Sequence, residues 1–204
     1  CKNTVQTLTA TGGVINSYVV FSENFNSGIG TFTPTNSSTG GTPANADWNN
    51  RANGYAWYSA YDAKNIVFTS NDSSLMLSNS YSQGNFPRAT TSTILTSPQF
   101  SLVGVTNPKL VFYHHYRDWD TTDFARVEIS VNGGAFTNLV TYTTTRGNWD
   151  PFTMVMESID LSAYIGESNL KIRFKYDAKY CWWWAIDNVS VTANKQEITW
   201  TASP

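Results

Sequence analysis

The sequence predicts an all-β fold, a two-sheet antiparallel β-sandwich of the jelly-roll type. Short runs of alternating apolar and polar residues recur along the chain, separated by clusters of Gly, Asn, Ser, Thr and Pro. No segment shows the periodicity of a long amphipathic helix. Asn132-Gly133-Gly134 lies between two alternating runs, 124–131 and 136–140, and an Asn-Gly pair in that position is the strongest short-range signal of a β-hairpin.

The remaining strands are expected in chain order between the turn clusters. Residues 14–25 are expected to form the first strand. The polar connection at 26–54 is long, and loops of this length are usually functional or disordered. Further strands are expected at 55–61, 65–69, 90–95, 109–116, 152–161, 170–177 and 185–192, with one helical turn at 162–166. Many short strands without intervening helices are typical of a sandwich.

The length of the chain predicts one domain with short flanks. At 204 residues with 41% hydrophobic content, the chain can bury one complete core, which we assign to residues 14–193. Residues 1–13 are interpreted as a leader or the end of a preceding domain. Residues 194–204 carry their own apolar pattern, which indicates a linker or the start of a following domain. Neighbouring domains of the same polypeptide are therefore expected partners.

Charge and composition argue against two classes of partner. Only 14% of the residues are charged and the net charge is −2, so no basic field attracts nucleic acid or an anionic membrane. No run approaches the roughly 18 apolar residues that membrane insertion needs. Few Lys and Glu with abundant Thr and Asn indicate a secreted or cell-surface protein. Cys1 and Cys181 are compatible with a disulfide, which the sequence does not establish.

The motifs of common enzyme classes are absent from the sequence. His114 and His115 are adjacent in a strand, so they point to opposite faces and cannot converge on one metal or proton; we expect one in the core and one at the surface. There is no Gly-x-Ser-x-Gly elbow, no His-Glu-x-x-His pair and no Gly-rich phosphate loop. A pair of distant carboxylates for glycoside hydrolysis stays open. The chain is predicted not to be an enzyme.

Two carboxylates lie where the pattern predicts burial. Glu23 shares a strand face with Phe21 and Phe25, and Asp187 follows Trp184-Ala185-Ile186. Terminal strands of a sandwich often pair, and two facing buried carboxylates repel unless one is protonated or a cation lies between them. Calcium, which takes irregular oxygen cages, is the expected cation, with Asp47 as a third ligand.

An alternative without metal stays open for the same residues. Glu23 would then pair with a basic side chain, for which Arg51, Lys109 and Arg173 are the candidates, and Asp187 would cap local backbone amides. The segment that holds Asp47, residues 45–51, would be a polar turn.

Aromatic residues in predicted loops suggest a surface that stacks on sugar rings. The residues expected at such a site are Trp119, Trp149, Tyr180 and Trp182, with Asp118 and Asp120 as partners for hydroxyl groups. Core packing is expected instead for Trp48, Trp57 and Trp184. In the run Trp182-Trp183-Trp184, alternation places Trp183 on the opposite face, so the triplet cannot be wholly exposed.

Several segments occur in an order that resembles a known family. They are Phe21-Ser22-Glu23-Asn24-Phe25, Leu95-Thr96-Ser97-Pro98, the hairpin 127–134, Ile159-Asp160-Leu161-Ser162, Ile172-Arg173-Phe174-Lys175-Tyr176 and Trp184-Ala185-Ile186-Asp187-Asn188-Val189. The sequence resembles the MAM-like jelly-roll modules of bacterial surface proteins, the cleaved-adhesin and choice-of-anchor group, over roughly residues 18–193.

The resemblance implies a structural calcium ion near the joined termini, with Glu23, Asp47 and Asp187 at the matching positions. The loop around Asp47 departs from the family pattern, where alternating Asp and Gly are usual. Three functions follow. The first is a non-catalytic adhesion or binding module stabilised by calcium, whose partner is a glycan or a host or surface protein. The second is a carbohydrate-binding module, and the third is a structural spacer.

Overall fold

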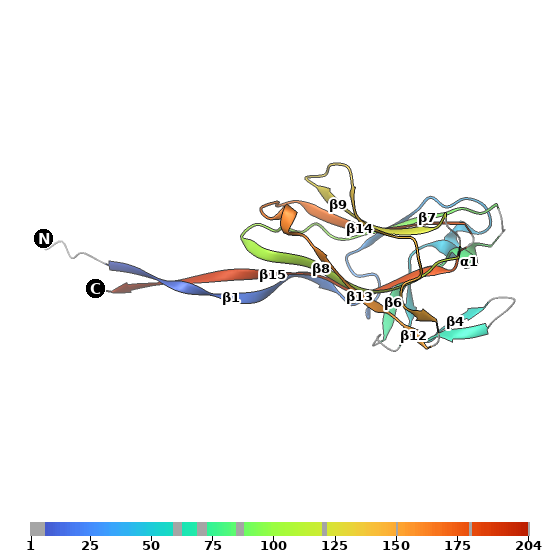
Figure 1. Ribbon diagram of the computed structural model, residues 1–204, viewed down its shortest axis with the longest axis horizontal. Coiled ribbons are helices and arrows are strands. Elements are labelled where there is room, and N and C mark those ends of the chain that lie inside the picture. Colours follow the sequence, from blue (N-terminus) through green and yellow to red (C-terminus); the bar gives the residue numbers. More distant parts are fainter. Residues whose placement is uncertain are drawn as a thin grey trace, which may run out of the picture.

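The computed structural model describes residues 7–58, 63–68, 73–84, 88–119, 122–149, 151–179 and 181–203. Two antiparallel sheets pack face to face, and a two-stranded ribbon extends from one end of the sandwich (Figure 1). The predicted all-β two-sheet sandwich is therefore confirmed. Within the described residues, no helix has the length and apolar character needed to cross a membrane.

The first sheet has six strands. Its order is β13 (Val155–Asp160), β8 (Val105–Arg117), β15 (Trp183–Ser203), β6 (Ser74–Ser78) and β3 (Asn49–Ala52), and β1 (Thr7–Glu23) also pairs with β15. β15 is the central strand: β8 borders one edge, and β6 and then β1 border the other. The expected pairing of the terminal strands is confirmed.

The second sheet has five strands in the order β10 (Thr137–Tyr142), β9 (Phe124–Val131), β14 (Leu170–Ala178), β7 (Thr91–Thr96) and β2 (Thr33–Asn36). The hairpin β9–β10 turns where Asn132 and Gly133 take positive φ angles of 54° and 74°, as the sequence predicted. The short 3-10 helices η1 (Pro43–Ala46) and η2 (Ser162–Tyr164) and the helical turn α1 (Ser80–Gln83) lie in connections.

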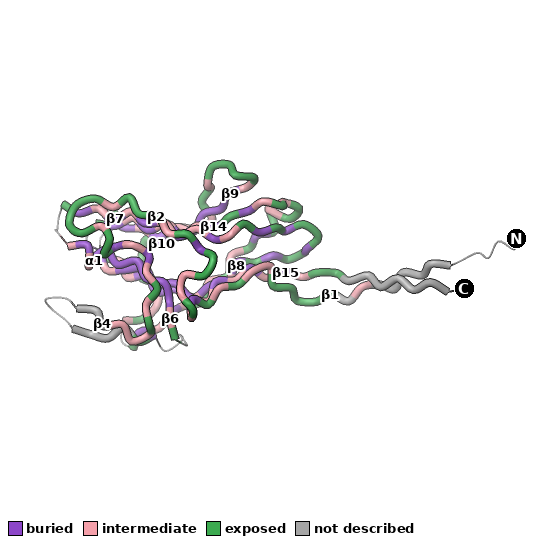
Figure 2. Tube along the Cα trace, turned by 180° about the vertical axis from the view of Figure 1, so that it is seen from behind, coloured by how far each residue is buried: buried purple, intermediate pink, exposed green. Residues whose placement is uncertain are grey.

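The core lies between the two sheets, and buried residues occur along the strands of both (Figure 2). Successive residues of a strand point to opposite faces, so every second residue faces this core. Phe112 of β8, Phe174 of β14 and Trp184 of β15 are completely buried there. Trp48 is buried as expected, and its ring meets that of Trp184 edge to face at 5.6 Å. The side chain of Trp57 lies outside the described side chains. Each fully buried side chain of this size contributes roughly 1.5–3 kcal/mol.

A second apolar cluster covers the outer face of the six-stranded sheet. Trp183 and Ala185 of β15 point outward and are fully buried under Phe152 and Met154. Phe152 belongs to a small hairpin of β11 (Asn148–Trp149) and β12 (Phe152–Thr153), and a second hairpin pairs β4 (Tyr55–Tyr58) with β5 (Ala63–Ile66). The sandwich therefore has a partial third layer.

Glycine permits the close approach of the β11–β12 hairpin. Gly147 precedes β11 with a φ of 87°, and a Cβ added there would lie 2.2 Å from the carbonyl oxygen of Thr153 and 2.7 Å from the His115 ring. A larger residue at this position would clash with both and would also be strained at positive φ.

The ribbon consists of β1 and the second half of β15. Their pairing runs from Thr7 with Ser203 to Glu23 with Val189. The expected domain limits at 13 and 194 both lie inside these strands, and the flanking segments pair with each other. That either flank leads into a further domain stays a prediction.

Two histidine–tryptophan pairs join β8 to β15 on opposite faces. The Trp184 indole donates to His114 Nδ1 over 3.2 Å on the inner face, and the Trp183 indole donates to His115 Nδ1 over 3.1 Å on the outer face. His115 Nε2 lies 3.1 Å from the carbonyl oxygen of Asn148, to which it donates. The expectation that one histidine is at the surface is wrong: both are fully buried, because the third layer covers the outer face.

Both histidines are neutral in the folded protein. Burial, with a smaller contribution from the positive charge of Arg146, lowers the pKa of His114 to about 3. Burial also lowers the pKa of His115 to about 4, although its bond to Asn148 opposes the shift. Nδ1 of each ring accepts an indole N–H, so the proton of each neutral ring is on Nε2.

We expect acid to destabilise the fold through these two histidines. Below the unfolded pKa of about 6.5, the unfolded chain binds two protons that the folded protein excludes. The contribution of the two histidines to stability is therefore fully present above about pH 6.5, and it is lost as the pH falls toward the folded pKa values of about 4 for His115 and about 3 for His114. The expected slope from the pair is about 2.7 kcal/mol per pH unit within this window. Urea unfolding at a series of pH values between 7.5 and 4.5 measures this slope.

The controls are His114→Asn and His115→Asn. An asparagine Oδ1 can accept the indole N–H where Nδ1 does, but it does not titrate. Each variant should remove about half of the histidine contribution to the slope, and the double variant should remove all of it. An unchanged slope in the double variant would contradict the assignment.

Candidate functional site

A strand junction lies where β15 exchanges one neighbour for another. Its last pair with β6 is Ile186 with Met76, and its nearest pair with β1 is Val189 with Glu23. Asp187 lies between these two pairs, with Asn188 in a bulge at a φ of 50°. The fold thus brings the end of β1 close to Asp187 along the sheet, as the sequence predicted.

Three backbone carbonyl oxygens converge on the Asn50 side chain at this junction. Asn50 Nδ2 lies 2.7 Å from the oxygen of Phe25, 3.4 Å from that of Leu75 and 3.5 Å from that of Gly28. An amide group has two hydrogens, so it cannot donate a good bond to all three. The centre of these three oxygens therefore attracts more positive charge than the two hydrogens of one amide supply. Sequence reasoning did not identify Asn50, because its partners come from distant segments.

Glu23 is half-buried beside this centre. Its Oε1 accepts a hydrogen bond of 3.0 Å from the amide of Phe25, whose carbonyl is one of the three that converge. A Cβ at Gly30 would lie 1.8 Å from Glu23 Oε2, so only glycine fits there without moving the carboxylate. Among the described residues, Glu23 makes no ion pair with Arg51, Lys109 or Arg173, and Arg173 pairs with Glu128 instead.

Each of the other two expected ligands accepts hydrogen bonds from the residue that follows it. Asp47 Oδ1 accepts from the amide of Trp48 over 2.8 Å. Asp187 is fully buried, and its two oxygens accept from the backbone and side-chain amides of Asn188 over 2.8 and 3.1 Å. The local capping of Asp187 matches the alternative that the sequence left open.

Calcium fits part of this junction. Carbonyl and carboxylate oxygens are the ligands that calcium takes, and Phe25, Gly28 and Leu75 supply three that already converge. Asn50 would add a fourth if its amide turned to present Oδ1. Across the described part of the chain, Glu23, Asp47 and Asp187 do not form a group of three ligands within 4.8 Å of one another. The junction therefore fits a cation held mainly by backbone oxygens rather than by three carboxylates.

Aromatic rings gather at one end of the outer face, in what we call the aromatic surface: Trp119, Trp149, Trp182 and Tyr81. The Trp182 ring lies 5.8 Å from that of Trp119 and 5.6 Å from that of Trp149. Tyr81 of α1 stacks on Trp182 at 5.6 Å with an angle of 11°. Trp119 is 69% exposed, whereas Trp149 and Trp182 are half-buried.

Arg117 supports the aromatic surface. Its guanidinium carbon lies 4.2 Å from the centre of the Trp149 ring and 5.7 Å from that of Trp182. Burial lowers the pKa of this guanidinium. Tyr81 and Arg117 were not identified from the sequence, since nothing in their local pattern shows that they meet Trp182.

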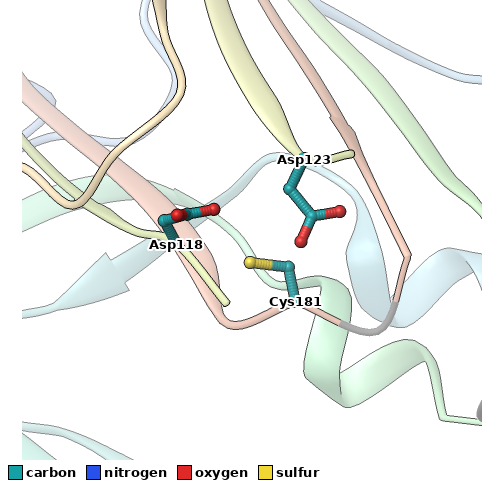
Figure 3. Close-up of side chains that lie close together, drawn as sticks. All are labelled: Asp118, Asp123 and Cys181. Atoms are coloured by element: carbon teal, nitrogen blue, oxygen red, sulfur yellow. The ribbon is translucent and has the colours of Figure 1, made fainter. Parts of the chain in front are cut away.

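The structure thus brings together three of the residues expected to bind a ligand, Trp119, Trp149 and Trp182. Tyr180 and Asp120 lie outside the described residues. Asp118 points toward Asp123 and Cys181 (Figure 3).

Asp118, Asp123 and Cys181 form a compact cluster whose potential ligand atoms all lie within 4.8 Å of one another. The Cys181 thiol donates to the carbonyl of Arg117 over 3.1 Å, and Asp123 Oδ1 accepts from the amide of Lys179 over 2.7 Å. Cys181 is a free thiol, and Cys1 lies outside the described residues. Burial raises the pKa of Cys181, and the neighbouring Asp123 adds to the effect.

Neither a protein-family model nor a curated protein matches this sequence. The fold is similar to the K1 cleaved adhesin domain of Lys-gingipain from Porphyromonas gingivalis W83, with a TM-score of 0.57 and 19% identity over 86% of this chain and 97% of that domain. The K3 cleaved adhesin domain matches with a TM-score of 0.54 and 18% identity over 85% of this chain and 98% of that domain. The chain therefore has the jelly-roll fold of the cleaved adhesin domains, as its motifs predicted.

Proposed function

We propose that this domain is a non-catalytic adhesion or binding module of a secreted or cell-surface bacterial protein. The observation that carries the proposal is the exposed Trp119 ring. It meets the Trp182 ring edge to face in the aromatic surface. A shared fold with cleaved adhesin domains supports the same class of function. At these identities, the likeness concerns the fold, and the ligand class depends on the residues of the aromatic surface.

A carbohydrate is the ligand class that the aromatic surface favours. Sugar rings present C–H groups that pack on the face of an aromatic ring, and an indole held in place by neighbouring rings loses little entropy on binding. Trp182 is held by Tyr81 on one side and by Trp149 on another. The exposed Asn148, next to Trp149, can bond sugar hydroxyl groups. A host or surface protein is the alternative partner.

Replacing Trp119 by alanine should weaken glycan binding by up to about tenfold, because the stacking contact contributes roughly 0.5–1.5 kcal/mol beyond its buried area and about 1.4 kcal/mol corresponds to tenfold. A glycan array identifies the sugar, and calorimetry on the best hit measures the change. Met156→Ala is the matched control, since Met156 is also exposed but lies on β13, outside the aromatic surface. An array without binding above background would remove the carbohydrate proposal.

We also propose that a structural calcium ion joins β1 to β15 at the strand junction. Glu23, Asp47 and Asp187 remain the carboxylates proposed for it, and the converging carbonyls around Asn50 support Glu23 best. The ion would neutralise the Glu23 carboxylate and take the place of the two amide hydrogens of Asn50. Its role would be to hold the loop after β1 against β6.

The test of this ion is thermal unfolding with and without chelator. Chelator should lower the melting temperature, and added calcium should restore it. In Asn50→Asp, a carboxylate would face three carbonyl oxygens, so the metal-free variant should lose about 1–3 kcal/mol of stability. Calcium should restore that loss, because the new carboxylate is a better ligand than the amide.

Asn50→Ala is the control for the lost amide, since it removes the hydrogen bonds without adding a charge. If calcium rescues neither the chelated wild type nor Asn50→Asp, then the Asn50 amide closes the junction without metal.

A structural spacer is the remaining alternative. The paired β1–β15 ribbon would suit a rigid connection to neighbouring domains. This role predicts that the domain binds neither a glycan nor a surface protein.

A further inference from the structure

The cluster of Asp118, Asp123 and Cys181 has a different chemistry from the strand junction. Asp118 follows β8, Asp123 precedes β9, and Cys181 lies between β14 and β15, so two connections meet at one end of the sandwich. Figure 3 shows the three side chains pointing toward one another. Asp123 and Cys181 are fully buried, whereas Asp118 is half-buried. Asp118 is therefore the member of the cluster that is partly exposed to solvent.

A buried tyrosine hydroxyl faces the same cluster. Tyr176 is completely buried, and its hydroxyl has no hydrogen-bond partner at normal geometry. The groups around that hydroxyl are Cys181, Tyr116 and Asp123. A thiol sulfur is a weak acceptor, whereas a thiolate is a strong one. The Tyr176 hydroxyl, which lies beside Cys181, is thus placed to donate a stronger hydrogen bond when the sulfur is ionised.

An ionised Cys181 needs a cation beside it. Two carboxylates within 4.8 Å of the sulfur would repel a thiolate, and the low-dielectric surroundings would increase the cost. A divalent metal ion removes both costs, because it binds all three anionic groups at once. One sulfur and two carboxylate oxygens would then bind the ion, and the Tyr176 hydroxyl would donate to the metal-bound sulfur.

We propose that Asp118, Asp123 and Cys181 bind a thiophilic divalent cation of the zinc class. Sulfur distinguishes this site from the junction, since zinc takes Cys and Asp ligands in tetrahedral sites and calcium takes oxygen alone. Tyr176 acts as a positioning residue that donates to the metal-bound sulfur. Tyr116, whose hydroxyl lies 3.5 Å from Asp118 Oδ1, orients that carboxylate in the same way.

The experiment uses Co²⁺ as an optical probe in the Cys1→Ser variant, which has Cys181 as its one thiol. One equivalent of Co²⁺ should produce the thiolate-to-cobalt charge-transfer band in the near ultraviolet, and Zn²⁺ should abolish that band by displacement. Zn²⁺ should also raise the melting temperature by about 5–10 °C at a hundredfold excess over its dissociation constant. Absence of the band at saturating Co²⁺ would overturn the proposal.

Variants separate a metal site from a structural cluster. Cys181→Ser should remove the band, and Asp118→Asn should weaken Co²⁺ binding by at least about tenfold without altering the metal-free melting temperature. Because Asp118 is half-buried, this variant carries the test even if Cys181→Ser does not fold. Tyr176→Phe should shift the energy of the band and weaken binding about tenfold.

Asp160→Asn is the matched control, since Asp160 is an exposed acid outside the cluster, and it should leave Co²⁺ affinity unchanged. A band that survives Cys181→Ser, or equal affinities in Asp118→Asn and Asp160→Asn, would overturn the proposal. The calcium response of the junction should persist in Cys181→Ser, so failure of one site is distinguishable from failure of the other.

Discussion

The two indole-to-imidazole hydrogen bonds between β8 and β15 constrain the rest of the structure. Adjacent residues of a strand point to opposite faces, so two adjacent histidines can meet two adjacent tryptophans only if one pair lies on each face. The bonds also require neutral rings, and neutral rings are kept by burial on both faces. The inner pair is buried by the opposite sheet. The outer pair is buried by a separate layer, which the two-sheet fold does not itself supply.

That outer layer is what creates the aromatic surface. Trp183 is fully buried, its ring stacks on Trp149 at 5.7 Å, and Trp149 in turn meets Trp182. Trp119 completes the series at the solvent boundary with 69% of its surface exposed. The aromatic surface is therefore continuous with the apolar packing of the third layer. A ligand that stacks on Trp119 would bind a ring backed by rigid neighbours, which lowers the entropic cost of binding.

The two candidate ion sites flank the buried part of β15. Cys181 precedes the strand and faces two carboxylates, whereas Asp187 and Asn188 form the bulge where β6 gives way to β1. The junction offers backbone oxygens, which suit a hard cation, and the cluster offers sulfur, which suits a softer one. Both sites lie where connections meet and the ladder of backbone hydrogen bonds is interrupted, so polar groups there need other partners.

The sequence by itself determined the sandwich and the β9–β10 hairpin, because period-two alternation and Asn-Gly turns are local signals. The pairing of the terminal strands was expected only from the general habit of sandwiches, and the structure confirmed it. It also placed Glu23 between Phe21 and Phe25 and selected Trp119, Trp149 and Trp182 as one group. Only the tertiary structure decided that both histidines are buried, that Asn50 lies amid three carbonyls and that Asp118 turns toward Cys181. These facts depend on contacts between segments far apart in the chain, and no local pattern encodes which distant side chain will cover a strand face or complete a cluster.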